Sequence, residues 1–206
     1  MHRVIDYYFT VRSPWAYLGH AKLRQVAARH GASIRHKPIP ILDVFEATGS
    51  LPQPKRPPAR NTYRWLELQR WRERRGVALN LQPAHVPFDG TLIDRAIIAA
   101  TDGGADSADL TGRALAAVWA EERDLADETT VREILERSGH DPEAVLAAAR
   151  SEEIAARYRR NGEEAVAAGV FGAPAYVLDG EHFWGQDRLE LLDDALASGR
   201  APYRPL

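Results

Sequence analysis

The sequence opens with an apolar run that stops abruptly at a serine and a proline. Residues Val4 to Val11 are rich in β-branched and aromatic side chains, which favours a buried strand. Ser13 is a good helix N-cap, and Pro14 suits the first helical position because the N–H it lacks would have no partner there. We therefore predict a strand, a helix over 15–30 and a second strand over 32–38, joined as a parallel β-α-β unit.

The middle of the chain is helical, and its end returns to strands. Residues 42–60 are irregular and rich in proline, which predicts a loop. Apolar residues then recur at helical spacing in several successive segments. Towards the end, two short apolar runs flank Asp179 and Gly180, the strongest hairpin signal in the sequence. An amphipathic helix over 187–197 closes the chain.

This order of elements predicts an α/β protein, a thioredoxin-like fold with a large all-helical insertion. Residues 1–42 and 169–206 are expected to form a discontinuous thioredoxin-like domain, and residues 43–168 a helical insertion domain. Within the insertion, the helical stretch over 142–168 is expected to break near Arg150.

Composition excludes several classes of function. The 27 Lys and Arg nearly balance the 29 Asp and Glu, so charge gives no reason to expect nucleic acid or an anionic membrane as a partner. The chain has no cysteine, so any thiol must come with a ligand, and the seven histidines include no pair at helical ligand spacing, so we predict no metal. No apolar run approaches the roughly 20 residues of a membrane span. The N-terminus lacks the apolar region of a signal peptide, so we expect a cytoplasmic protein.

Three stretches of the sequence resemble one known family. They are DYYFTVRSPWAYLG at 6–19, GVFGAPAYVLDGEHFWGQDRL at 169–189 and, more loosely, PPARNTYRWLELQRW at 57–71. All three are similar to 2-hydroxychromene-2-carboxylate isomerases and to their relatives, the kappa-class glutathione transferases. The likeness extends over nearly the whole chain. It implies a thioredoxin-like fold, glutathione as cofactor, a small aromatic carboxylate as substrate and a homodimer.

The resemblance also implies roles for individual residues. Ser13 would hydrogen-bond the glutathione sulfur, although local sequence alone indicates only a helix cap. Ala173 precedes Pro174, where the family has a cis-proline, and the Ala173 backbone would pair with the cysteinyl backbone of glutathione. Gln186 and Asp187 match the pair that holds the γ-glutamyl end, and Asp187 also favours a helix start.

Three further positions are expected near the ligands. Arg60 lies in the basic, proline-rich loop, where its charge would meet the glycyl carboxylate of glutathione or the substrate's carboxylate, with Lys55 and Arg56 as alternatives. Trp15, one turn into the first helix, would wall an aromatic substrate. Asp89 stands where relatives usually have Asn near the substrate pocket, and a carboxylate there would repel an anionic substrate unless an arginine pairs with it.

The resemblance implies a glutathione-dependent isomerase, in which the cofactor thiolate, stabilised at Ser13, adds reversibly to a conjugated aromatic acid. Two alternatives stay open. In a kappa-like glutathione transferase the same thiolate would remain attached to an electrophile. A non-catalytic thioredoxin-like binding module is the other alternative, and Asp89 favours it. The lack of cysteine excludes a disulfide oxidoreductase.

Overall fold

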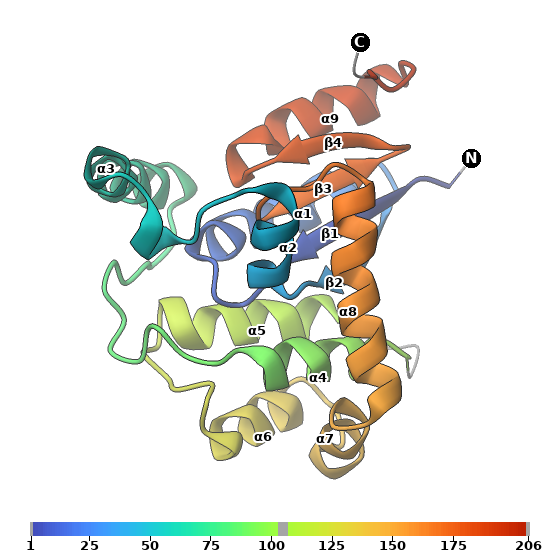
Figure 1. Ribbon diagram of the computed structural model, residues 1–206. Helices are drawn as coiled ribbons and strands as arrows, with labels where there is room; N and C mark the ends of the chain where they lie inside the picture. Colours follow the sequence, from blue (N-terminus) through green and yellow to red (C-terminus); the bar gives the residue numbers. More distant parts are fainter. Residues whose placement is uncertain (1, 103–106, 205–206) are drawn as a thin grey trace.

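A four-stranded mixed sheet forms the centre of the computed structural model, which describes residues 2–102 and 107–204 (Figure 1). The strand order is β2-β1-β3-β4. The strands are β1 (Val4–Phe9), β2 (Ser33–Pro38), β3 (Ala175–Leu178) and β4 (Glu181–Trp184). β1 pairs in parallel with β2 and antiparallel with β3, and β3 pairs antiparallel with β4. The two ends of the chain therefore share one sheet, as the sequence predicted.

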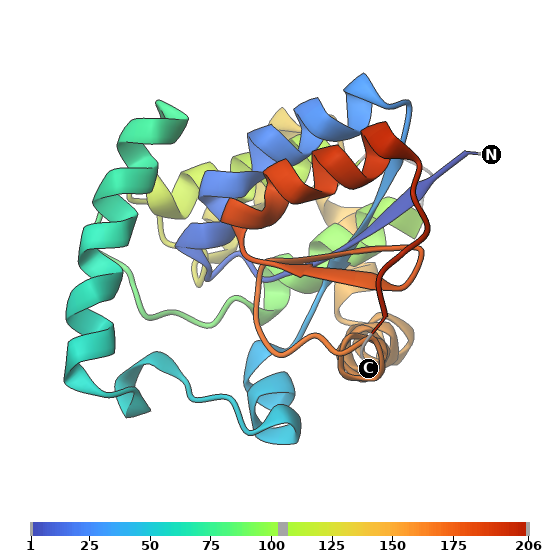
Figure 2. The same ribbon diagram turned by 90° about the horizontal axis from the view of Figure 1, so that it is seen from above.

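Helices cover both faces of this sheet. α1 (Pro14–Arg29) and α9 (Leu189–Ser198) lie side by side over one face (Figure 2). Successive side chains of a strand point to opposite faces. Accordingly, Tyr7 is buried in the main core, to which α1 and α9 contribute, whereas Tyr8 belongs to a second apolar cluster with α8 (Glu152–Ala167).

The prediction of a loop over 42–60 was wrong at both ends, and Arg60 lies in the first turn of a helix and not in the loop. The structure places α2 at the start of this stretch (Ile41–Thr48), and Gly49 ends that helix with a φ of 71°. The prolines of this stretch all follow residue 51, so they leave the preceding turn free to be helical and to bury Val44. The chain then runs irregularly, apart from one short turn, to α3 (Pro58–Arg75), which begins with proline at a position where a helix tolerates it.

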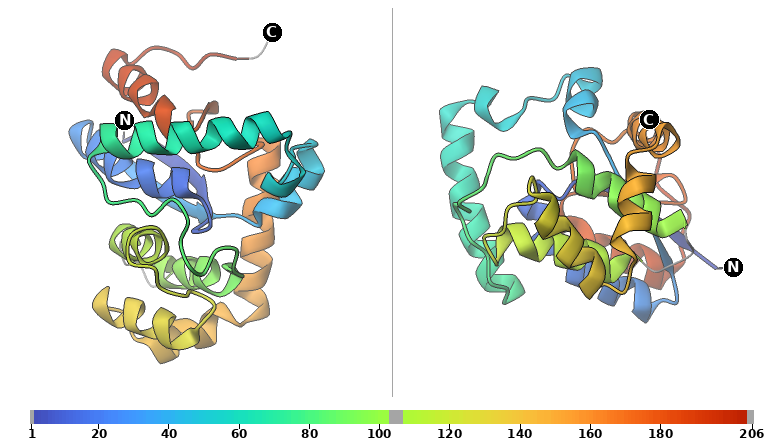
Figure 3. Two further views of the ribbon diagram at one scale, coloured as in Figure 1. Left: turned by 90° about the vertical axis from the view of Figure 1, so that its left-hand side faces the viewer. Right: turned by 90° about the horizontal axis from the view of Figure 1, so that it is seen from below.

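The remaining helices lie to one side of the sheet, with α6 and α7 farthest from it (Figure 3). They are α4 (Thr91–Asp102), α5 (Ala108–Trp119), α6 (Glu128–Arg137) and α7 (Pro142–Ala149). The break expected near Arg150 is confirmed, because Ser151 begins α8 by accepting a hydrogen bond from the Ile154 N–H at 3.3 Å. α8 packs against α2, α4 and β2, so it returns the chain to the sheet. In the described residues, no helix is both long and apolar enough to cross a membrane.

Candidate functional site

Ser13 lies where β1 gives way to α1, and its hydroxyl joins the two ends of the sequence. The Ser13 Oγ accepts a hydrogen bond from the Ala16 N–H at 3.2 Å and donates one to the Ala173 carbonyl oxygen at 3.3 Å. The bond between Ala173 and Pro174 is cis, as expected. Ser13 is therefore a helix cap, as local sequence indicates, and it also contacts the backbone that precedes the proline. Its side chain is largely buried, with 8% of the residue exposed.

A buried carboxylate holds the segment that leads into α1. Asp94 of α4 is fully buried and accepts hydrogen bonds from the Thr10 hydroxyl at 2.9 Å, the Val11 N–H at 3.1 Å and the Tyr158 hydroxyl at 3.3 Å. From α5, the Trp119 indole N–H donates to the Val11 carbonyl at 3.0 Å. Burial raises the pKa of the Asp94 carboxyl to about 7, against the opposing effect of these hydrogen bonds. Nothing in the sequence pattern distinguished Asp94 from a surface aspartate.

Two neighbouring cavities meet at Ala173, and Ser13 lines one of them while the cis-proline lines the other. The first, here called the Asp187 cavity, has a volume of about 680 Å³ and lies between α3, the segment before β3 and the segment after β4. It brings together six of the predicted site residues. They are Trp15, Arg60, Ala173, Pro174, Gln186 and Asp187.

The second cavity, here called the arginine cavity, has a volume of about 650 Å³ and is lined by Ser13. It shares one wall with the Asp187 cavity. The residues that line both cavities are Trp15, Phe45, Arg56, Arg64 and Ala173. Trp15 therefore lies beside both cavities, and its contact with a substrate stays a prediction. The two cavities thus meet close to the Ser13 hydroxyl.

Asp89 lines neither cavity, although the residue before it, Phe88, lines the arginine cavity. The Asp89 Oδ1 atom accepts hydrogen bonds from the Thr91 N–H at 3.0 Å and the Thr91 hydroxyl at 2.6 Å. These bonds, and after them the charge of Arg12, lower the pKa of the Asp89 carboxyl. Asp89 is thus bonded to the first residue of α4, and its role beside a substrate stays a prediction.

Asp187 is positioned by the glycine that precedes the last helical segment. Gly185 has a φ of 99°, and a Cβ built there would lie 2.4 Å from the Asp187 Oδ1 atom, so only glycine fits. The Asp187 Oδ2 atom accepts a hydrogen bond from the Arg188 side chain at 2.6 Å, and the Asp187 side chain remains 37% exposed. One carboxylate is thus presented to the Asp187 cavity.

Gln186 is almost completely buried, and its side-chain oxygen is already bonded. The Arg75 Nε atom donates to the Gln186 Oε1 at 2.9 Å, and the Arg75 Nη2 donates to the Gln186 carbonyl oxygen at 2.8 Å. A third bond runs from the Arg75 Nη1 to Glu190 at 2.9 Å. Sequence reasoning missed Arg75, which connects the end of α3 to the segment that carries Asp187. The contact of Gln186 with a cofactor stays a prediction.

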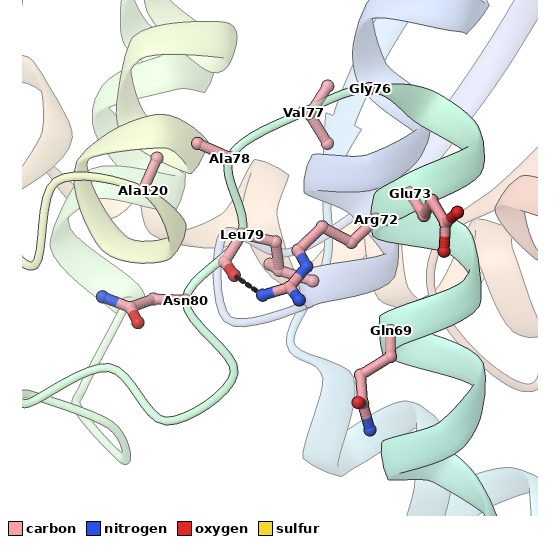
Figure 4. A pocket seen from close by; sticks show the side chains of 9 residues that line it. All are labelled: Gln69, Arg72, Glu73, Gly76, Val77, Ala78, Leu79, Asn80 and Ala120. Atoms are coloured by element: carbon pink, nitrogen blue, oxygen red, sulfur yellow. Dashed lines mark hydrogen bonds between the residues drawn. The ribbon is translucent and has the colours of Figure 1, made fainter.

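A third hollow lies apart from this site, between the end of α3 and the segment after it (Figure 4). A side-chain hydrogen bond within it runs from Arg72 to the Leu79 carbonyl oxygen at 3.3 Å. It contains none of the predicted site residues. Across the described ranges, no group of three or more His, Asp or Glu side chains is placed to hold a metal ion.

The chain matches known proteins over nearly its whole length. The family model of the DSBA-like thioredoxin domain matches residues 4–197. The chain belongs to this family. Within it, the chain is 31% identical over 198 residues to a 2-hydroxychromene-2-carboxylate isomerase of Sphingobium xenophagum, covering 95% of this chain and 99% of that protein. A protein of the same name from Pseudomonas putida is 29% identical, with 94% of each chain covered.

The DSBA-like fold is also seen in a solved structure of 2-hydroxychromene-2-carboxylate isomerase. That structure superposes with a TM-score of 0.81 at 28% identity and covers 95% of each chain. The thioredoxin-like fold predicted from the sequence is therefore confirmed. So is the resemblance to this isomerase family over nearly the full length.

Asp94→Asn should alter how stability depends on pH. Because the folded pKa of Asp94 is about 7 and the unfolded value is about 4, this carboxyl stabilises the fold most below pH 4 and loses that contribution as pH rises to 7. Asn cannot titrate. We expect the free energy of unfolding of wild type, relative to Asp94→Asn, to fall by about 3 kcal/mol between pH 4.5 and 7.5 in urea titrations. A difference independent of pH would contradict this assignment.

Arg75→Met should loosen the attachment of α3. The substitution leaves the Gln186 and Glu190 oxygens without their donor, so we expect the free energy of unfolding to drop by about 2 kcal/mol. Arg74→Met is the matched control, because Arg74 is exposed on the same helix and lines neither cavity. Denaturant titration of both variants measures the difference. Equal losses would show that Arg75 has no special anchoring role.

Proposed function

We propose that this chain is a glutathione-dependent isomerase that acts on a conjugated aromatic carboxylic acid. The observation that carries the proposal is the meeting of two cavities at one polar contact, the 3.3 Å hydrogen bond between Ser13 and Ala173. One cavity suits a peptide-like zwitterion, and the other suits an aromatic anion. Relatives named 2-hydroxychromene-2-carboxylate isomerase, about 30% identical over nearly the whole chain, support the same reaction class.

Glutathione fits the groups that line the Asp187 cavity. Its γ-glutamyl ammonium would face the Asp187 carboxylate, and its glycyl carboxylate would face the Arg60 guanidinium. Between these charges, the Ala173 N–H has no hydrogen-bond acceptor among the described residues, so it is available to a peptide carbonyl. An extended tripeptide carries these three groups in that order.

The chemistry at the junction follows from where Ser13 lies. Glutathione, when bound, would supply a thiolate that adds reversibly to the conjugated acid and leaves after bond rotation. Ser13 would donate its hydroxyl hydrogen to the sulfur in place of the Ala173 oxygen, an easy exchange because the present bond is long at 3.3 Å. The positive end of α1 also favours an anion at this point. Asp94 keeps the segment before Ser13 in place.

Ser13→Ala should lower the glutathione-dependent isomerisation of 2-hydroxychromene-2-carboxylate by about 100-fold in kcat, because a stabilising donor to the thiolate is lost. The measurement follows the absorbance of the acid with and without glutathione. Ser151→Ala is the matched control: Ser151 also caps a helix, so it loses about the same 1 kcal/mol of stability, but it lines neither cavity. Unchanged turnover in Ser13→Ala would refute the role of the hydroxyl, and product that retains sulfur would identify a transferase.

Asp187→Asn should weaken glutathione binding by about tenfold, because the ammonium loses its charged partner. Calorimetry measures the dissociation constant, and kcat at saturating glutathione should change little. Asp194→Asn, which removes an exposed carboxylate from α9 outside both cavities, is the control. If glutathione does not bind wild type even at millimolar concentration, the proposed cofactor is wrong. The homodimer and the cytoplasmic location stay predictions.

A further inference from the structure

The arginine cavity has an unusual balance of charge. Arg12, Arg56 and Arg64 line it, and no acidic side chain does so within the described part of the chain. The whole sequence is slightly acidic, with a net charge of -2, so this concentration of cations is local. Aromatic rings from Trp15, Trp65 and other residues form much of the remaining wall. The lining thus pairs flat apolar surfaces with three positive charges.

None of these three guanidinium ions forms a direct ion pair among the described residues, although the Arg12 charge, after the hydrogen bonds from Thr91, helps to lower the pKa of the Asp89 carboxyl. None of them has a carboxylate within 4.0 Å among the residues that the structure describes. Arg56 donates only to the Leu51 carbonyl oxygen at 2.8 Å and lies over the Phe45 ring. Burial, followed by the charge of Arg56, lowers the pKa of Arg64 to about 10. Partly buried like charges of this kind are stabilised when an anion enters.

The three cations lie at two different parts of the cavity. Arg12 neighbours Ser13 and lines the arginine cavity alone, whereas Arg56 and Arg64 belong to the wall that both cavities share. The Arg12 stem lies across Gly90, where a Cβ would come within 3.2 Å of the Arg12 Cγ atom. A side chain at Gly90 would displace the aliphatic part of Arg12. Glycine at this position therefore allows the Arg12 side chain to take its present path.

We infer that the arginine cavity binds a flat aromatic acid that carries two anionic groups, one facing Arg12 and the other facing the Arg56 and Arg64 pair. A monocarboxylate would pair with the cation or cations at one end of the cavity and would leave those at the other end without an anionic partner. On the proposed function the glycyl carboxylate of glutathione pairs with Arg60, which lines only the Asp187 cavity, and this leaves Arg56 and Arg64 to the acid. The inference rests on the proposed function only for the reaction that this acid undergoes. Binding of the acid is tested in the absence of glutathione.

Calorimetry at one fixed ionic strength tests the inference on the glutathione-free protein. The probes are benzene and naphthalene dicarboxylates with different separations of the two carboxylates, each compared with the matching monocarboxylate. At least one dicarboxylate should bind wild type ten times or more as tightly as its monocarboxylate, because it forms a second charged contact. In Arg12→Gln and in Arg64→Gln this advantage should fall below threefold. Arg24→Gln, an exposed position on α1 outside both cavities, should keep it.

Two results overturn the inference. One is a set of dicarboxylates that bind wild type no more tightly than their monocarboxylates, and the other is an advantage that survives in both Arg12→Gln and Arg64→Gln. Arg12 lies outside the Asp187 cavity, so the dissociation constant of glutathione for Arg12→Gln should lie within twofold of the wild-type value. Such binding shows that the variant is folded. If wild type prefers dicarboxylates but does not bind glutathione, the inference stands and the proposed cofactor fails.

Discussion

The site depends first on one buried carboxylate. Asp94 is fully buried and accepts three hydrogen bonds, two of which come from Thr10 and Val11, directly before Arg12 and Ser13 of the arginine cavity. Burying a carboxylate is costly unless it is well bonded, so these contacts offset that cost. The aspartate and Tyr158 belong to the helical insertion, whereas Thr10 and Val11 directly follow the first strand. The insertion therefore supports the site as well as the sheet.

The second requirement is that the two ends of the chain meet. Pairing between β1 and β3 puts Tyr8 opposite Ala175, and this register brings Ala173 to the Ser13 hydroxyl. A shift of one residue would turn every side chain of β3 to the other face. α3 adds the third side of the site, and Arg75 fixes that helix to the segment carrying Asp187. Three remote parts of the sequence are thus held together by backbone pairing, a buried carboxylate and one guanidinium.

Local sequence signals were sufficient for much of this structure. Ser13 followed by proline, and the Asp179-Gly180 turn, determine their own conformations, so the first helix and the hairpin could be predicted. α2 was missed because the prolines beyond it dominated the pattern of the whole stretch. Asp94 and Arg75 could not be recognised, since their roles come from partners more than 60 residues away in the sequence. Asp89 forms local hydrogen bonds to Thr91, and its expected place near a substrate stays a prediction.

Different elements of the fold hold the Ser13 contact and the charged side chains of the site. The sheet and the Asp94 hydrogen bonds hold the segments that carry Ser13 and Ala173, next to which the two cavities lie. The charges that would select an acid lie instead on α3 and on the segment before it, with Arg12 as the exception. Arg75 holds α3 at its end. The other side chains along this helix can therefore vary in sequence without disturbing Ser13. On the proposed function, relatives with the same Ser13 and Ala173 contact should therefore differ in the acids they accept mainly through residues equivalent to Arg56 and Arg64.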